Sequence, residues 1–161
     1  MSARAEHFLA LVQLNADYAA AVDGGRAEDL ARWCELFTPD GIYRLVPREN
    51  HERGFPLATL AFQGQGMLRD RVYAIRETLF HDPYYQRHVI GLPRILDEAG
   101  GAIECETPYA VFRTKPNGLS TVFNVGRYLD TVVATDGGLR LAQRIAVYDS
   151  EMIPNSIIYP I

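Results

Sequence analysis

Apolar residues near the start of the chain recur at the three- and four-residue spacing of helices. One stripe runs from Phe8 to Val22 and contains a single polar side chain, Asn15. The pair Gly24-Gly25 follows, and glycine at a helix C-terminus readily adopts the left-handed conformation, so we expect the first helix to end there. The stripe residues are Phe8, Leu11, Val12, Tyr18, Ala19 and Val22, and a second, shorter stripe contains Leu30, Trp33, Cys34 and Phe37.

The next part of the chain predicts a turn, a strand, a loop and a third helix. Thr38–Gly41 contains the Pro-Asp-Gly sequence of a turn, and Ile42–Val46 is a strand-like run that stops at Pro47. Residues 48–56 are polar and predict a loop. A third helical stripe should end near Asp82, because the proline that follows disfavours helical geometry in the residue before it. Its apolar positions are Leu68, Val72, Ile75 and Leu79.

Four long strand-like stretches follow Pro83. They are separated by turn sequences at residues 97–101, 115–118 and 136–138, and such short links predict an antiparallel meander. Bulges or bends are expected at Pro93, Pro108 and Gly126, which lie inside the stretches. In one stretch Ile103, Cys105, Thr107, Tyr109 and Val111 share a face, with Glu104 and Glu106 opposite. In the last, Leu139, Leu141, Ile145 and Val147 share a face, with Arg140 and Arg144 opposite.

The predicted order is therefore helix, helix, strand, helix and four antiparallel strands, which is an α+β fold. A long sheet with bends can curl around helices packed on its concave face and leave a cone with an open mouth. No internal repeat or linker interrupts the chain, and 161 residues suffice for one domain with a buried core. We expect a single cone-shaped domain over residues 1–161.

Composition narrows the classes of function. Hydrophobic residues make up 48% and charged residues 22% of the chain, as in globular proteins. No apolar run is long enough to span a bilayer, and no signal-peptide core follows the first residues, so we expect a cytoplasmic protein without a membrane partner. The net charge of −4 argues against nucleic acid. Cys34 and Cys105 fit buried apolar positions rather than a disulfide.

Arginine is unusually frequent among the basic residues. Lysine occurs once, at Lys115, so fifteen of the sixteen basic residues are arginine. Arginine tolerates burial in interfaces better than lysine, because its planar group is weakly hydrated and makes bidentate bonds. The excess therefore agrees with contact surfaces for partner chains. The codons of a GC-rich genome would produce the same excess, and both explanations stay open.

The C-terminal segment Ile153–Ile161 contains no charged side chain. Free tails are usually polar. The segment is therefore expected to dock, either against its own domain or against a neighbouring chain, and the sequence leaves both possibilities open.

The sequence does not predict a metal or nucleotide site. His81, His88 and Asp82 could form a two-histidine, one-carboxylate site, but His81 and Asp82 fit a helix end and a loop better. Gly64–Gly66 is too short for a phosphate-binding loop and is more typical of a helix start. We therefore expect no metal and no nucleotide cofactor in this chain.

Acid–base residues are the main enzymatic candidates. A cone would bring Asn15 and Tyr18 of the first helix near Tyr43, His88 and Tyr109 of the sheet, and these five are the candidates for lining a pocket. Histidine beside tyrosine or a carboxylate in a dry pocket can transfer protons. The competing interpretation is that His88 is bonded to a neighbouring strand and the tyrosines fill the core.

Three blocks of the sequence resemble the small (β) subunits of aromatic-ring-hydroxylating dioxygenases. Residues 33–47 follow the pattern W-x-x-L-F-T-x-D-x-x-Y-x-x-x-P, residues 123–130 contain G-R-Y-x-D, and residues 149–154 follow D-S-x-x-I-P. The blocks occur in the family's order over nearly the whole chain. One departure is Val89–Pro93 after His88, where the family often has Ser-Asn-Val. The tail is most similar to the branch that acts on aromatic acids such as salicylate, anthranilate or terephthalate.

This resemblance implies a nuclear-transport-factor-like cone, the broad fold of scytalone dehydratase and ketosteroid isomerase. It implies a structural subunit of an oxidoreductase, with no catalytic residue, cofactor or metal in this chain. A larger α subunit would hold a Rieske iron–sulfur cluster and a mononuclear non-haem iron. Three α and three β chains would assemble, with contacts between β chains, and a separate reductase would supply electrons from NAD(P)H.

The alternative is a stand-alone dehydratase, isomerase or cyclase that uses His88 as a base, together with Tyr43 and Tyr109. It requires a histidine–acid pair that faces a dry cavity, whereas the subunit interpretation requires none. The fold is compatible with both, because one fold supports many functions.

Overall fold

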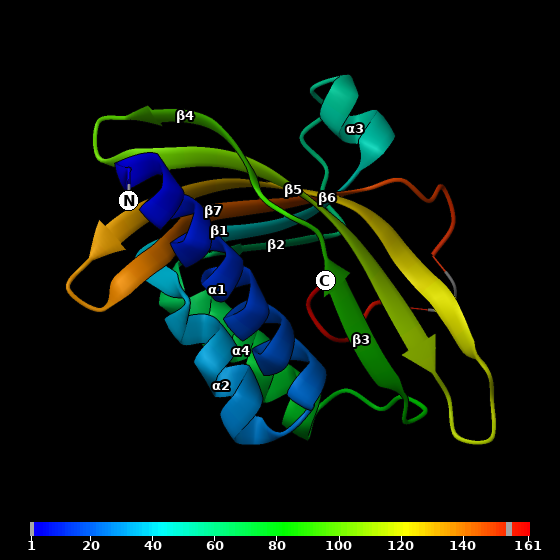
Figure 1. Ribbon diagram of the computed structural model, residues 1–161. Helices are drawn as coiled ribbons and strands as arrows, with labels where there is room; N and C mark the ends of the chain where they lie inside the picture. The colour runs from blue at the N-terminus through cyan, green and yellow to red at the C-terminus, as the bar shows by residue number, and fades with distance from the viewer. Residues whose placement is uncertain (1, 154–155) are drawn as a thin grey trace.

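The computed structural model describes residues 2–153 and 156–161, and in this part of the chain a bent seven-stranded sheet carries helices on its concave side (Figure 1). Residue 154, the proline that closes the D-S-x-x-I-P block, lies outside the described residues, as do residues 1 and 155. The α+β cone expected from the pattern is therefore present. Helices pack beneath the sheet, and the short helix Arg48–Glu52 lies above it (Figure 1).

The first helix ends where the sequence predicted. Helix α1 spans Ala3–Gly24, and Gly25 caps it with a left-handed φ of 69°. Its buried face consists of Leu11, Leu14, Asn15, Tyr18, Ala21 and Val22. Phe8, Val12 and Ala19 of the predicted stripe lie at the edges of this face and are partly buried. Nowhere in the described residues is there a helix with the length and apolar character needed to cross a membrane.

The other helices differ from the prediction at their ends. Helix α2 spans Ala27–Glu35, so Phe37 begins a strand instead of closing the helix. Helix α4 spans Gly64–Glu77 and stops before the predicted end near Asp82. The reason is local, because Thr78 has a non-helical φ of −125° and its hydroxyl donates to the Ala74 carbonyl. The predicted loop contains the short helix α3, Arg48–Glu52.

The strands after Pro83 pair antiparallel, as predicted, but the parallel pairing of β1 makes the sheet mixed rather than antiparallel throughout. Its order is β2-β1-β7-β6-β5-β3, and β4 also pairs with β5. Strand β1 runs parallel to β7, and the other pairs are antiparallel. A long connection with two helices separates β1 from β3, so no hairpin fixes the direction of β1. The strands are β1 Phe37–Pro47, β2 Leu60–Gln63, β3 Tyr85–Ile90, β4 Arg94–Ala99, β5 Ala102–Thr114, β6 Ser120–Thr135 and β7 Gly138–Tyr148.

The first stretch after Pro83 is two strands rather than one. Strands β3 and β4 lie along the same edge of β5, joined by Gly91-Leu92-Pro93. The Gly91 N–H donates to the Pro108 carbonyl at 2.8 Å, and Pro93 has no N–H with which to continue the ladder. The break therefore lies where the sequence predicted an irregularity.

Most of the predicted bulges are absent from the described strands, and bulges occur at other positions. The predicted turn at residues 38–41 lies within β1, as an irregularity between Phe37 and Ile42. In β5 the register shifts after Val111, while Pro108 is paired with Arg127 without a shift.

A bulge in the β6–β7 ladder decides which side chains of β7 face the helices. Leu141 and Gln143 pair with the successive residues Val132 and Thr131, so one extra residue of β7 lies between them. An extra residue reverses the alternation of side chains on the strand that carries it. Arg144 therefore points inward and is fully buried, and its predicted outward position was wrong. Strand β5 has no such bulge before Val111, and its predicted inner residues are all buried.

Gly126 is required for the close approach of β6 to β7. A Cβ atom at this position would lie 2.0 Å from the Val147 carbonyl oxygen and 2.8 Å from the Tyr148 Cα atom. Backbone atoms on a paired strand have little freedom to move away.

We therefore predict that Gly126→Ala lowers the free energy of unfolding by about 3 kcal/mol, the upper part of the range for overpacking. Gly66→Ala is the matched control, because a Cβ atom there meets nothing within 4 Å and alanine favours the helix. Urea denaturation measures both variants. A Gly126→Ala protein as stable as the parent would contradict the close approach.

Candidate functional site in the cone interior

The C-terminal segment enters the cone and fills its interior. Ile161 is fully buried, and Ile157 and Ile158 are at most 8% exposed. The Arg71 guanidinium donates to the carbonyl oxygens of Ile157 and Ile158 at 3.0 and 2.6 Å. Of the two possibilities that the sequence left open, the structure places residues 156–161 against their own domain.

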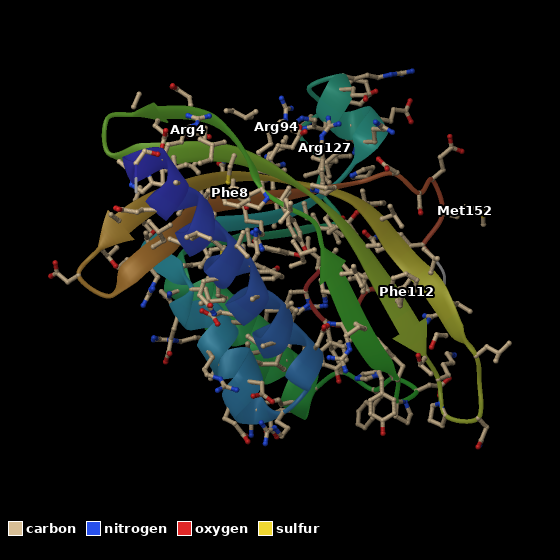
Figure 2. All side chains as sticks on the ribbon, in the orientation of Figure 1. Arg4, Phe8, Arg94, Phe112, Arg127 and Met152 are labelled. Atoms are coloured by element: carbon tan, nitrogen blue, oxygen red, sulfur yellow. The ribbon has the colours of Figure 1, made fainter. Side chains whose placement is uncertain are left out.

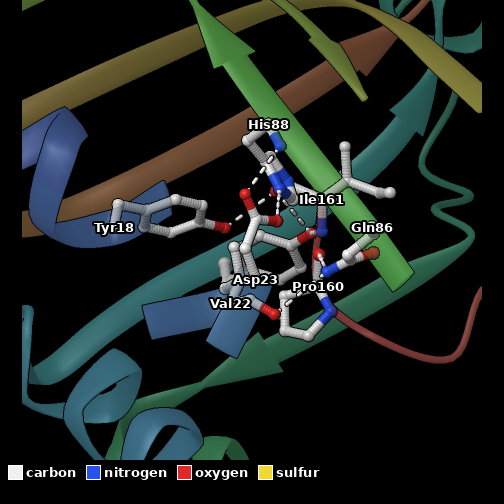
Figure 3. Close-up of polar contacts among 8 residues, drawn as sticks. Tyr18, Val22, Asp23, Gln86, His88, Pro160 and Ile161 are labelled. Carbon is white, nitrogen blue, oxygen red and sulfur yellow. Dashed lines mark hydrogen bonds and ion pairs between the residues drawn. The ribbon is translucent and has the colours of Figure 1, made fainter. Parts of the chain in front are cut away.

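Two tyrosines from different elements hold the end of this segment (Figure 3). Tyr18 of α1 donates its hydroxyl hydrogen to the backbone oxygen of Ile161 at 2.7 Å. Tyr43 of β1 donates to the same oxygen at 3.2 Å and accepts the Ile161 N–H at 2.9 Å. Both rings are fully buried. Two hydroxyl donors therefore converge on one oxygen in a dry environment.

His88 of β3 is bound to Asp23 at the end of α1. The Nδ1 atom lies 2.6 Å from Asp23 Oδ1, and the His88 backbone N–H donates to Oδ2 at 2.7 Å. Both side chains are buried, at 0% and 4% exposure. A carboxylate on Nδ1 favours the tautomer with hydrogen there, which leaves Nε2 as an acceptor. Within the described residues this Nε2 is buried and has no hydrogen-bond partner.

Arg144 of β7 is the central charge of the interior. Its guanidinium donates to both carboxylate oxygens of Asp130 at 2.9 and 2.7 Å and to Asn15 Oδ1 at 2.6 Å. The Tyr18 and Tyr128 rings both pack against it, with centroids 4.2 and 4.0 Å from the guanidinium carbon. Burial alone would lower the pKa of Arg144, but the Asp130 carboxylate outweighs burial and raises it.

Tyr109 of β5 completes the set of predicted residues. Its ring stacks on Tyr128 with centroids 4.3 Å apart, and its hydroxyl donates to Asn124 Oδ1 at 2.8 Å. Burial raises the pKa of Tyr18 to about 12 and also raises those of Tyr43, Tyr109 and Tyr128. The four phenols therefore stay neutral at physiological pH.

All five pocket-lining candidates lie in the interior, but they contact four different groups. Tyr18 and Tyr43 contact the C-terminal segment, Asn15 contacts Arg144, and Tyr109 contacts Asn124. His88 contacts Asp23 instead of a neighbouring strand's backbone. That these residues line a ligand pocket stays a prediction.

Sequence reasoning missed the acidic partners of this interior. Asp23 was hidden because it is the last charged residue before the glycines that end α1, where an exposed position is usual. Arg144 was hidden because the bulge in β7 sets its orientation, and Asp130 is the acid with which it pairs. The G-R-Y-x-D block contains both Tyr128 and Asp130, so this block was the available signal.

The residues weighed as metal ligands lie apart. His81 Nδ1 is 3.0 Å from the Asp82 carbonyl, and its ring packs on Tyr84 and Tyr159 near the cone mouth, while His88 faces Asp23. In the described parts of the chain, no three His, Cys, Asp or Glu side chains are grouped to hold a metal ion. Both cysteines are free and buried, and burial raises the thiol pKa of Cys34 to about 11 and that of Cys105 to about 12.

Comparison with known proteins identifies a family and close relatives. The model of the SnoaL-like domain family matches residues 3–145. The small subunit of anthranilate 1,2-dioxygenase from Burkholderia cepacia is 36% identical over 89% of this chain and 88% of its own. The beta 1 subunit of the terminal oxygenase component of terephthalate 1,2-dioxygenase from Comamonas is 35% identical over 94% of this chain and 96% of its own.

A solved structure agrees with these relatives. It is the beta subunit of a protein described as an aromatic-ring-hydroxylating dioxygenase from Novosphingobium aromaticivorans. The two chains share 31% identity and a TM-score of 0.89, over 99% of this chain and all of the other. With the SnoaL-like match, this likeness confirms the predicted nuclear-transport-factor-like cone.

Removing one partner of the buried ion pair should be costly. We predict that Asp130→Asn or Arg144→Met alone lowers the free energy of unfolding by about 3–5 kcal/mol, because a charge stays buried without its partner. The double variant Asp130→Leu/Arg144→Met should lose much less than the sum. Urea denaturation gives the three values, and Arg94→Met, at an exposed pair with Glu106, should change stability by at most about 1 kcal/mol. Additive losses in the double variant would show that the pair is not coupled.

The buried phenols should make the protein labile in alkali. Tyrosine in the unfolded chain has a pKa of 10.0, whereas that of Tyr18 is about 12 in the folded chain. The unfolded state therefore binds fewer protons in this interval, so the stability contribution is complete below pH 10 and is lost as pH rises towards 12. We expect tyrosinate absorbance and loss of circular dichroism to coincide for the buried phenols. Tyr18→Phe should make the pH dependence shallower, and exposed Tyr85→Phe is the control. Full tyrosine ionisation with an intact native spectrum would refute this linkage.

Proposed function

The chain belongs to the SnoaL-like domain family and, within it, to the small (beta) subunits of aromatic-ring dioxygenases, and we propose that it is the structural, non-catalytic subunit of such an enzyme. The relatives' similarity extends over about nine tenths of the chain or more, and the three sequence blocks that predicted this family lie between residues 33 and 154. The enzyme as a whole would be an oxidoreductase of aromatic compound catabolism.

The observation that carries the non-catalytic role is the filled interior. The space where acid–base residues of a cone would meet a substrate contains the chain's own Ile161, held by Tyr18 and Tyr43. A substrate needs that same space. The side chains of the interior therefore serve to hold the tail, the first helix and the sheet together.

We assign the redox centres to a larger α subunit. The described residues of this chain bring together no set of metal ligands, and a dioxygenase reaction needs iron. In this proposal the α subunit holds a Rieske cluster and a mononuclear iron, and three α and three β chains assemble. A reductase would supply electrons from cytoplasmic NAD(P)H, which places the complex in the cytoplasm.

An aromatic acid is the substrate class that we favour. The two relatives are named for anthranilate and terephthalate, and both compounds are benzene rings with carboxylate groups. Because the ring is bound and hydroxylated in the α subunit in this proposal, the residues of the present chain do not select among such acids.

The outer face of the sheet supports assembly. Val89, Ala110 and Val125 are neighbours across β3, β5 and β6, and Val89 and Val125 are 56% and 36% exposed. On the same convex side Arg94 and Arg127 lie together (Figure 2), where both contact Glu106 at 3.0 and 3.6 Å. Apolar side chains with neighbouring arginines are typical of surfaces that partner proteins cover.

A stand-alone acid–base enzyme is the second candidate, and the His88–Asp23 pair favours it. This pair is the histidine–acid arrangement that such an enzyme requires, and Nε2 of His88 is unpartnered within the described residues. The tail counts against it, because in the full chain Ile161 occupies the space beside the pair.

Co-production of this chain with the α subunit tests the subunit role. We expect a coloured, iron-containing complex with equal amounts of both chains, whose mass corresponds to three of each, by size-exclusion chromatography with light scattering and iron analysis. A colourless small oligomer that does not bind the α subunit would overturn the proposal.

The variant His88→Asn separates the two candidates, because its amide can still donate to Asp23. In the assembled enzyme we expect turnover per iron to stay within about twofold of the parent. A general base in that position would instead contribute about a hundredfold or more. Activity of the isolated small chain that His88→Asn abolishes would favour the stand-alone enzyme.

A further inference from the structure

A hollow on the outer side of helix α1 lies apart from the cone interior. Its volume is about 270 Å³, and it is bounded by α1, the C-terminal end of α2 and the start of β7 (Figure 1). The Leu141 N–H donates to the Leu36 carbonyl at 2.8 Å, so the end of α2 and the start of β7 are neighbours. Asp17 and Ala20, which line the hollow, are exposed residues of α1, whereas the buried face of α1 with Tyr18 is turned to the interior.

Arg140 of β7 lines the hollow with a guanidinium that has no carboxylate partner in the described parts of the chain. Its Nη1 donates to the Leu139 carbonyl at 2.9 Å, so other N–H groups of the fork are left to bind a ligand. A Cβ atom at Gly137 would lie 3.0 Å from Nη2, so this glycine leaves room for the guanidinium. The side chain is partly buried, and its planar fork matches the two oxygens of a carboxylate.

Two carboxylates line the same hollow from the helices. Asp17 of α1 accepts a hydrogen bond from the Gln13 amide at 2.8 Å, and Glu35 is the last residue of α2. Among the residues that the structure describes, neither carboxylate has an ion-pair partner. Arg32, the other basic lining residue, is already paired with the buried Asp29 carboxylate. The hollow therefore combines one available positive group from the sheet with two negative groups from the helices.

These charges and the apolar part of the lining select one class of ligand. A purely anionic ligand would be repelled by Asp17 and Glu35, and a purely cationic one by Arg140. A zwitterion complements both signs at once. Ala20 and Leu36 add hydrocarbon surface to the lining. The volume is below that of pockets for drug-sized ligands, so a molecule of the size of an amino acid fits it better.

We propose that this hollow binds a free α-amino acid with an apolar side chain. The ligand carboxylate pairs with Arg140, the ammonium group pairs with Asp17 and Glu35, and the side chain lies on Ala20 and Leu36. The site belongs to this chain alone and involves no chemical step. It does not rest on the subunit role, so the two proposals fail independently.

Titration of the full-length chain with L-leucine, followed by amide NMR spectra, tests the site. We expect saturable shifts at the amides of α1, α2 and the start of β7, and none at β3 or β5. Two analogues separate the charges, because 4-methylpentanoate lacks the ammonium group and 3-methylbutylamine lacks the carboxylate. Each analogue should bind at least about tenfold more weakly than leucine, as expected when a charge-assisted interaction is lost.

Variants of the charged residues assign their roles in binding. Arg140→Met should weaken leucine binding by at least about tenfold, because the ligand carboxylate loses its partner. Asp17→Asn/Glu35→Gln should remove the preference for leucine over 4-methylpentanoate. Arg94→Met is the matched control at a guanidinium outside the hollow and should leave leucine binding unchanged. Circular dichroism confirms that each variant is folded.

Filling the hollow gives a test that leaves all its charges in place. Ala20→Leu puts a larger side chain at an exposed position of α1, where leucine is nearly as good a helix former as alanine, and it should abolish the saturable shifts. Binding that survives Ala20→Leu, or equal binding of leucine and both analogues, would overturn the proposal. So would the absence of shifts at about 10 mM leucine, at which a site with a millimolar dissociation constant is mostly filled. None of these results depends on whether the α subunit assembles with this chain.

Discussion

The burial of Arg144 is the constraint on which the rest of the interior depends. A guanidinium without solvent is stable in a fold only when acceptors and aromatic faces surround it. Asp130 from β6 supplies the opposite charge, Asn15 from α1 supplies a further acceptor, and the Tyr18 and Tyr128 rings pack against the guanidinium. Since these partners come from α1 and β6, while Arg144 itself belongs to β7, the charge fixes how α1 lies in the concave face of the sheet.

Tyr18 connects this charge network to the tail. Its ring packs against Arg144, and its hydroxyl donates to the backbone oxygen of Ile161. Helix α1, which the ion pair positions, thus also binds the end of the tail through Tyr18, and Tyr43 of β1 binds the same residue. At the end of the same helix, Asp23 holds His88 of β3. The polar groups of the interior therefore form a connected set of structural contacts, which is the physical basis of the proposed non-catalytic role.

The same residue types suit an enzyme and a scaffold, and what occupies the interior distinguishes the two. Histidine, aspartate and tyrosine in a dry cone can transfer protons when a substrate reaches them. Here the chain's own segment takes that place, while the apolar and arginine-containing surface lies on the opposite, convex side of the sheet. A subunit that supports a larger catalytic chain needs a rigid body and a surface to be covered, and this arrangement provides both.

The sequence by itself determined the features that depend on neighbours along the chain: the end of α1 at Gly25, the inner face of β5, the break near Pro93, and the family through its three blocks. It also named five residues that the fold places in the interior. Only the tertiary structure decided that β1 runs parallel to β7, that Arg144 faces inward, that Asp23 meets His88, and that the tail enters its own cone. Each of these depends on residues far apart in sequence, or on a bulge visible only in the pairing of two strands, and local periodicity contains no information about either.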